Sequence, residues 1–115
     1  LSKHITRPVT LAASAVGLKI ILAANRPSVA DFDVYYKAIS DDASFDETNW
    51  VEVPKERILP SDENPGIFRD YEYIVGGPGG LSVPFNRFIL KFVMRSSNNA
   101  RVPQFKDLRV IALAV

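Results

Sequence analysis

The sequence predicts an all-β protein, an antiparallel β-sandwich of jelly-roll type with about seven or eight short strands. Apolar and polar residues alternate with a period of two in several windows, turn-forming residues separate these windows, and no window has a helical period. The clearest window is 85–95, where Phe88, Leu90 and Phe92 alternate with basic and β-branched residues. We expect this window to be a sheet strand whose apolar face packs on the core.

The N-terminal part predicts two strands, at 5–11 and 16–24, because Val16, Leu18 and Ile20 share one face. A secretory signal peptide is the alternative, since basic residues precede the apolar run 9–24 and small residues end it. Polar or small residues interrupt that run, at Thr10, Ser14, Gly17 and Lys19. We therefore expect strands, and no stretch reaches the roughly 18 apolar residues that span a membrane.

Further strands are expected at 31–40, 50–53 and 67–75. Pro54 ends the second of these, because proline has no N–H group to donate to a sheet ladder. The glycine-rich stretch 76–80 then breaks regular structure ahead of the strand at 85–95. A polar loop at 96–103 and an apolar strand at 108–115 complete the predicted order.

Length and composition favour a single domain over residues 1–115. A chain of 115 residues is long enough to bury its own core, and it has no cysteine. The lack of cysteine excludes thiolate catalysis, cysteine-based zinc sites and a disulfide framework. A net charge of +1 provides no general attraction to nucleic acid or to an anionic membrane. Because the sequence begins with Leu1, we expect a fragment or C-terminal domain of a longer protein.

Each candidate for chemistry has a simpler structural explanation. The stretch 76–80 lacks the Gly-Lys-Ser/Thr of a phosphate-binding loop, and His4 is the only histidine. Acidic residues that offer oxygen ligands to calcium lack EF-hand spacing; they are Asp31, Asp33, Asp41, Asp42, Asp46 and Glu47. The adjacent Asp62 and Glu63 do not fix the separation that glycoside hydrolysis needs. We therefore expect no catalytic residue, no metal site and no cofactor, and a protein that is not an enzyme.

One surface feature stands out, a basic stripe on the outward face of the strand at 85–95. Arg87, Lys91 and Arg95 recur at every fourth residue, and Ile89 and Val93 lie between them on the same face. Cross-strand pairing with acidic residues is the alternative use of these cations; the candidates are Asp70, Glu72 and Glu52. We predict that Arg87, Ile89, Lys91, Val93 and Arg95 form an interaction surface that another chain partly covers.

Several strings resemble a β-sandwich segment of tailed-phage virion proteins. They are residues 33–37 (DVYYK), 49–52 (NWVE), 88–97 (FILKFVMRSS) and 102–113 (VPQFKDLRVIAL). The resemblance covers the chain from residue 31 onward and is to tail, baseplate or neck proteins of marine myovirus-like phages. A weaker similarity is to galactose-binding-like jelly rolls, in which a basic penultimate strand, a polar loop and a proline-containing turn precede the last strand.

The phage resemblance implies a virion structural or assembly domain that works through protein–protein contacts. Other virion subunits are then the expected partners, a homo-oligomer is expected, and neither nucleic acid nor membrane is. The expected location is the virion, assembled in the host cytoplasm. The jelly-roll similarity implies the alternative, a carbohydrate-binding module that recognises a host surface glycan through a candidate ligand loop of Asn98, Asn99 and Arg101.

Overall fold

The computed structural model describes residues 2–27, 30–40, 43–54, 64, 66–76, 80–81, 83–96 and 103–114. Its elements are β1 (Ser2–Ile5), β2 (Val9–Asn25), β3 (Ala30–Ile39), η1 (Phe45–Glu47), β4 (Val51–Glu52), β5 (Arg69–Val75), β6 (Phe85–Ser96) and β7 (Gln104–Ala114). The strands predicted at 31–40, 50–53, 67–75 and 85–95 are confirmed, with ends shifted by a residue or two. The last strand begins earlier than predicted, at Gln104, because Phe105 already pairs with Ala24 of β2.

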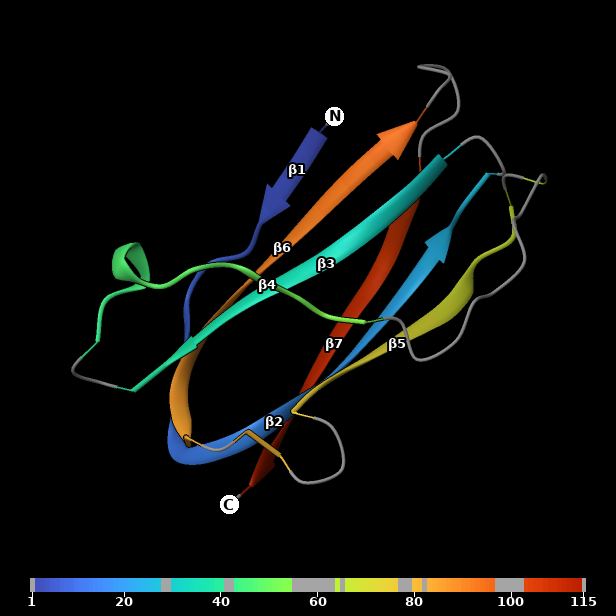
Figure 1. Cartoon of the computed structure of the whole chain (residues 1–115). Coiled ribbons are helices and arrows are strands. Elements are labelled where there is room, and N and C mark those ends of the chain that lie inside the picture. Colours follow the sequence, from blue (N-terminus) through green and yellow to red (C-terminus); the bar gives the residue numbers. More distant parts are fainter. Residues whose placement is uncertain are drawn as a thin grey trace.

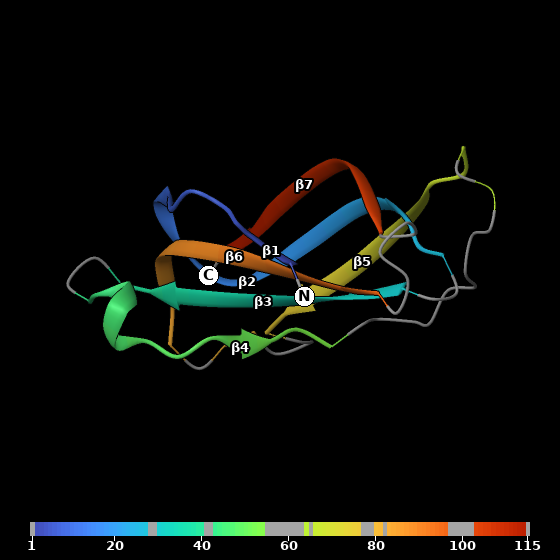
Figure 2. The same ribbon diagram turned by 90° about the horizontal axis from the view of Figure 1, so that it is seen from above.

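The described strands form one antiparallel sheet, in the order β4-β3-β6-β2-β5, with β1 also paired to β6 and β7 also paired to β2. The sheet curls into a half-barrel (Figure 1). Seen from above, β3 and β6 lie in one layer while β7, β2 and β5 lie in the layer that faces it (Figure 2). The predicted all-β, antiparallel architecture is therefore confirmed, but the two layers are parts of one continuous sheet, not separate sheets of a jelly roll.

The two strands predicted at 5–11 and 16–24 are instead the short β1 and the single 17-residue strand β2. Val9 and Thr10 of β2 pair with β6, whereas from Leu18 onward β2 lies between β5 and β7. A register shift between Thr10 and Ala15 accommodates the change of partner. Such an irregularity bends a strand without ending it, and Thr10 and Ser14, which interrupt the apolar run, lie exposed on this part of β2.

The core lies between the two layers. Phe32 of β3 meets Tyr71 of β5 edge to face, with 5.0 Å between the ring centroids, and meets Phe105 of β7 at the same distance. Phe92 of β6, a predicted core residue, is buried beside Phe105. The other buried apolar residues of the cluster are Ala15, Leu18, Ile20, Leu22, Ala24, Val34, Val53, Tyr73, Val75, Phe85, Phe88 and Leu90. Side chains from both layers thus fill the interior of the half-barrel.

Gly76, directly after β5, lies against Val16 of β2. Gly76 has a φ of 96°, and a Cβ there would lie 2.7 Å from the carbonyl oxygen of Val16. The N–H group of Leu81 donates to that same oxygen at 2.6 Å. Glycine is therefore required at Gly76 both for backbone conformation and for space. Residues 77–79 of the predicted glycine loop lie outside the described part of the chain.

Asn25, at the C-terminal end of β2, is a buried polar residue that holds the segment before β5. Its side-chain amide donates to the carbonyl oxygens of Asn64, at 2.9 Å, and Ile67, at 2.6 Å. Burial of an amide is favourable only where such partners exist. Asn25 therefore anchors the start of β5 against β2.

Candidate functional site

The structure places the predicted interaction surface on the outward face of β6. Phe88, Leu90 and Phe92 point into the core, and the alternate residues Arg87, Ile89, Lys91 and Val93 are half-buried on the opposite face. Arg95 is exposed at the end of this row. The orientation of the strand is confirmed, while the role of this face as a contact surface stays a prediction.

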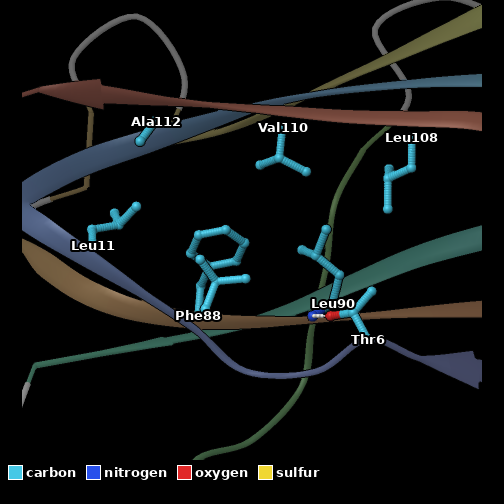
Figure 3. Close-up of a pocket in the computed structure, with 8 residues that line it drawn as sticks. Thr6, Leu11, Phe88, Leu90, Leu108, Val110 and Ala112 are labelled. Carbon is cyan, nitrogen blue, oxygen red and sulfur yellow. Dashed lines mark hydrogen bonds between the residues drawn. The ribbon is translucent and has the colours of Figure 1, made fainter.

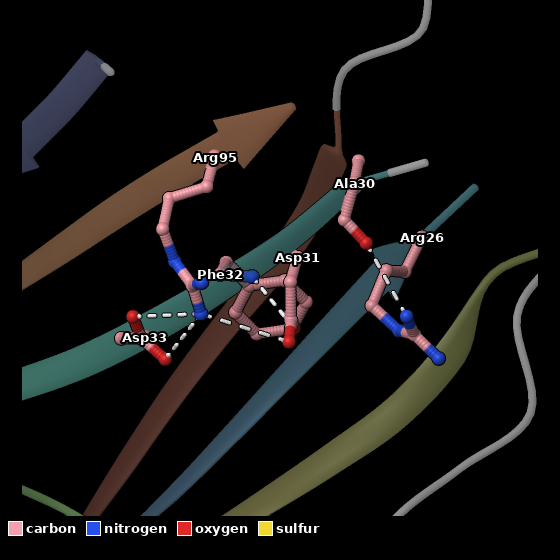
Figure 4. Close-up of polar contacts among 6 residues, drawn as sticks. All are labelled: Arg26, Ala30, Asp31, Phe32, Asp33 and Arg95. Carbon is pink, nitrogen blue, oxygen red and sulfur yellow. Dashed lines mark hydrogen bonds and ion pairs between the residues drawn. The ribbon is translucent and has the colours of Figure 1, made fainter. Parts of the chain in front are cut away.

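Arg95 pairs with two carboxylates of the neighbouring strand β3 (Figure 4). Its guanidinium Nη2 lies 3.0 Å from Asp33 Oδ2 and 3.7 Å from Asp31 Oδ2. The hydrogen bond from Arg95 to Asp33, followed by the charge of Asp33, raises the pKa of the Arg95 guanidinium. The cross-strand alternative thus applies to Arg95, with partners other than the three predicted carboxylates.

Lys91 lies among aromatic rings from its own chain. Its ammonium group is 4.8 Å from the ring centroid of Tyr35 and 4.6 Å from that of Trp50. Lys37 reaches the same Trp50 ring at 4.7 Å and also donates to the carbonyl oxygen of Phe45 at 2.9 Å. The segment that carries Trp50 therefore covers part of the face that we expected another chain to cover.

Arg87 is also engaged within the chain, because its guanidinium lies 5.0 Å from the ring centroid of Phe45 in η1. Cation–π contacts of this kind are worth about 0.5–1 kcal/mol at exposed sites. The three cations of the stripe thus have intramolecular partners: an aromatic ring for Arg87, two rings for Lys91 and two carboxylates for Arg95. They are less available to a second chain than the sequence suggested.

Three of the large apolar residues that are exposed in the described part of the chain lie on β7 instead. Leu108, Ile111 and Leu113 are 42%, 50% and 38% exposed. They belong to both faces of the strand, since Leu108 lies opposite Leu22 on the inner side while Ile111 lies opposite Lys19 on the outer side. Among the described residues, β7 pairs with β2 alone, so its other edge is open.

An apolar cavity opens between β7 and the facing layer (Figure 3). It has a volume of about 280 Å³ and is lined by Thr6, Val9, Leu11, Phe88, Leu90, Leu108, Val110 and Ala112. Thr6 is satisfied within its wall, because its N–H donates to Leu90 O at 2.9 Å and its Oγ1 accepts from Leu90 N at 3.1 Å. The volume is just below the usual range for ligand pockets, about 300–1,000 Å³. Its apolar lining suits side chains better than a polar cofactor.

The remaining candidates do not converge on a site. His4 stacks on Phe92 with 6.5 Å between ring centroids, and no three metal-ligating side chains gather in the part of the chain that the structure describes. Asp31 and Asp33 face Arg95. Several of the predicted candidates lie outside the described residues: Asp41, Asp42, Asp62, Glu63, Asn98, Asn99 and Arg101.

Sequence reasoning missed the open edge of β7 and the cavity beside it. One signal was available, because residues 110–114 are apolar at every position and therefore on both faces of the strand. Such a run is typical of a strand covered on both sides. The sequence does not show that β7 has a neighbour on one edge only.

Comparison with known protein families, curated proteins and solved structures finds no match for this chain. Within the described ranges, no helix has the length and apolar character that crossing a membrane requires. Arguments about function therefore rest on the surfaces described above.

Proposed function

We propose that this chain is a non-enzymatic structural domain of a tailed-phage virion protein, from the tail, baseplate or neck, that acts through protein–protein contacts. The resemblance of residues 33–37, 49–52, 88–97 and 102–113 supports the virion assignment. The exposed apolar side chains of β7 support the mode of action. In this proposal the partners are other virion subunits, and the site of action is the virion.

The observation that carries the proposal is that β7 exposes large apolar side chains on both of its faces, Ile111 and Leu113 on the outer one and Leu108 on the inner one. Leu108 lines the cavity and is exposed, and Val9 on the opposite wall is 40% exposed. Exposed apolar side chains that gather on one strand in this way favour an interaction site. Burial of these side chains against a partner is stabilising by about 25 cal/mol per Å² of apolar area.

Chemical accessibility tests this proposal directly, because the chain has no cysteine of its own. A single cysteine is introduced by Ile111→Cys and reacted with a maleimide, in the free chain diluted until it is monomeric and in virions that carry it. We expect fast labelling in the free chain and protection in the virion. Val83→Cys is the matched control, since Val83 is 70% exposed before β6 and far from β7 in sequence. Equal labelling of Ile111→Cys in both states contradicts the proposal.

A carbohydrate-binding module is the second candidate, and the aromatic rings of Trp50 and Tyr35 beside Lys91 favour it. Trp50 and Tyr35 lie half-buried on the outer face with Lys91 between them. Aromatic rings beside cations suit an acidic sugar. The test is a glycan array probed with the purified chain and with Trp50→Ala. Glycan binding that Trp50→Ala abolishes, together with an unprotected Ile111→Cys, replaces the assembly proposal by this one.

A further inference from the structure

The open edge of β7 has the properties of a self-association surface. Resting on the proposed function, we propose that its partner is a second copy of this chain, whose β7 pairs antiparallel with this β7 about a two-fold axis at Val110. The sheet then continues from β2 and β7 of one copy into β7 and β2 of the other. Every strand pair in the described sheet is antiparallel, so this addition keeps the existing pattern.

The two halves of the β7 edge differ in charge. Sheet edges are usually guarded against pairing by charges, by proline or by bulges. In β7 the charges lie in the first half, at Lys106, Asp107 and Arg109, together with a register shift against β2 between Phe105 and Leu108. A second register shift lies at the other end, between Leu113 and Ala114. Residues 110–114 carry neither charge nor proline. The strand is thus divided into a charged first half and an uncharged second half.

An antiparallel two-fold arrangement suits this asymmetry. With the axis at Val110, the two Val110 side chains face each other and Leu108 of each copy faces Ala112 of the other, all on the inner side. On the outer side, Arg109 of each copy faces Ile111 of the other. No like charges lie directly opposite each other, because the charged half of each β7 runs past the apolar half of its partner. The two Arg109 side chains are diagonal neighbours on the outer side, and each also has Asp70 of its own chain at 3.9 Å, which reduces their repulsion. With that ion pair the edge is complementary to itself, as an isologous interface requires.

The pairing also covers the cavity. Leu108, Val110 and Ala112 line the cavity on the β7 side. The second copy places its own Ala112, Val110 and Leu108 beside them on the same face. A strand edge alone gives a contact near the lower end of the range for stable interfaces, about 1,200 Å² in total. A second chain over the mouth of the cavity would bury further apolar area, on Val9 and Leu108. We therefore expect a dimer that depends on concentration in the micromolar range.

Disulfide cross-linking tests the axis, because the chain contains no cysteine. Val110→Cys places the two thiols directly opposite each other, within the Cα separation of about 4.4–6.8 Å that a disulfide needs. Under mild oxidation we expect Val110→Cys to form covalent dimers at least about tenfold faster than the exposed control Val83→Cys. Leu108→Cys mixed with Ala112→Cys should cross-link faster than either variant alone. Rates for Val110→Cys that equal the control overturn the pairing.

A charge test at Ile111 gives an independent measure. Because Ile111 faces Arg109 of the other copy, Ile111→Lys creates two like-charge contacts and Ile111→Glu creates two opposite-charge contacts. Sedimentation equilibrium should give a dimer dissociation constant about tenfold higher for Ile111→Lys than for Ile111→Glu. Lys19 lies beside Ile111 in the same chain, so the unfolding midpoint of each variant is measured to confirm that folded protein is compared. Equal dissociation constants overturn the pairing.

The outcomes separate this inference from the proposed function. A chain that stays monomeric, with no preferential cross-link at Val110→Cys, rejects the β7 dimer. If Ile111→Cys is nevertheless protected in virions, the assembly function stands and a different subunit covers β7. If the dimer forms in solution but Ile111→Cys is labelled in virions as in the free chain, the dimer stands and the assembly function fails.

Discussion

β6 and β7 are both long strands of the same sheet, yet their surroundings differ. β6 has β3 along one edge and β1 and β2 along the other, and its inner residues are buried. β7 has β2 along one edge, and both of its faces leave apolar side chains exposed. The comparison shows that alternation fixes the faces of a strand, whereas its place in the sheet decides how much of each face is covered.

The largest expected effect comes from truncation in β6. Phe92 is buried against Phe105, so Phe92→Ala should lower the free energy of unfolding by about 3–5 kcal/mol. Leu113→Ala in β7 is the matched truncation at an exposed site and should cost less than about 1 kcal/mol in the monomer. Urea unfolding of both variants at low protein concentration measures the difference. Similar losses for the two would remove the contrast between these strands.

A methyl group added between β5 and β7 tests how far the edge strand yields. A Cβ at Gly17 would lie 2.6 Å from the carbonyl oxygen of Val75 and 3.2 Å from Leu113 Cδ1. We expect Gly17→Ala to destabilise the fold by about 1–3 kcal/mol, because the backbone oxygen cannot move aside alone. Thermal unfolding provides the measurement. A neutral result would mean that β2 and β5 separate easily, and that the layer of β7, β2 and β5 is less tightly packed than the structure indicates.

Much of the comparison was predictable from sequence, and the rest depends on long-range pairing. The period of two correctly placed Phe88, Leu90 and Phe92 inside and Arg87 and Lys91 outside. It did not show that Trp50 lies over Lys91, because that contact depends on which strand adds beside β3. For the same reason the bend of β2 and the open edge of β7 were missed. Residue alternation records faces, while edges are decided by partners far along the chain.

Tyr73 is expected to give a smaller effect of opposite sign. Its buried hydroxyl has no hydrogen-bond partner in the described structure, so Tyr73→Phe should stabilise the fold by up to about 1 kcal/mol at neutral pH. Burial, and then the charge of Asp31, raise the pKa of Tyr73 above its ordinary value of 10.0. The unfolded chain therefore ionises first, and stability that is complete below about pH 10 falls as the pH rises further. The urea unfolding midpoint should therefore fall more between neutral and alkaline pH for the wild type than for Tyr73→Phe. A Tyr73→Phe variant that is less stable than the wild type would show that the hydroxyl is hydrogen-bonded.

The smallest effect is expected at the exposed end of β6. The side chain of Arg95 is 50% exposed while it pairs with Asp33. Exposed ion pairs contribute about 0–1 kcal/mol, so Arg95→Ala should change the free energy of unfolding by less than about 1 kcal/mol, and added salt should reduce the difference. Denaturant unfolding at low and high ionic strength measures both. A loss above 2 kcal/mol, on the order of a buried pair, would show that the pair is covered more fully than the 50% exposure of the Arg95 side chain indicates.

The bend of β2 also bears on how the chain folds. The first residues of β2 can pair only once β6 has been synthesised. Its second half can pair only once β5 and β7, which follow much later in the chain, have been synthesised. An early apolar strand whose partners are all distant implies slow folding, because loop-closure entropy must be overcome before the pairings contribute. During that interval β2 is exposed and prone to aggregation. Refolding by dilution should therefore be slow and sensitive to protein concentration. A chain truncated before β7 is expected to require a chaperone to stay in solution.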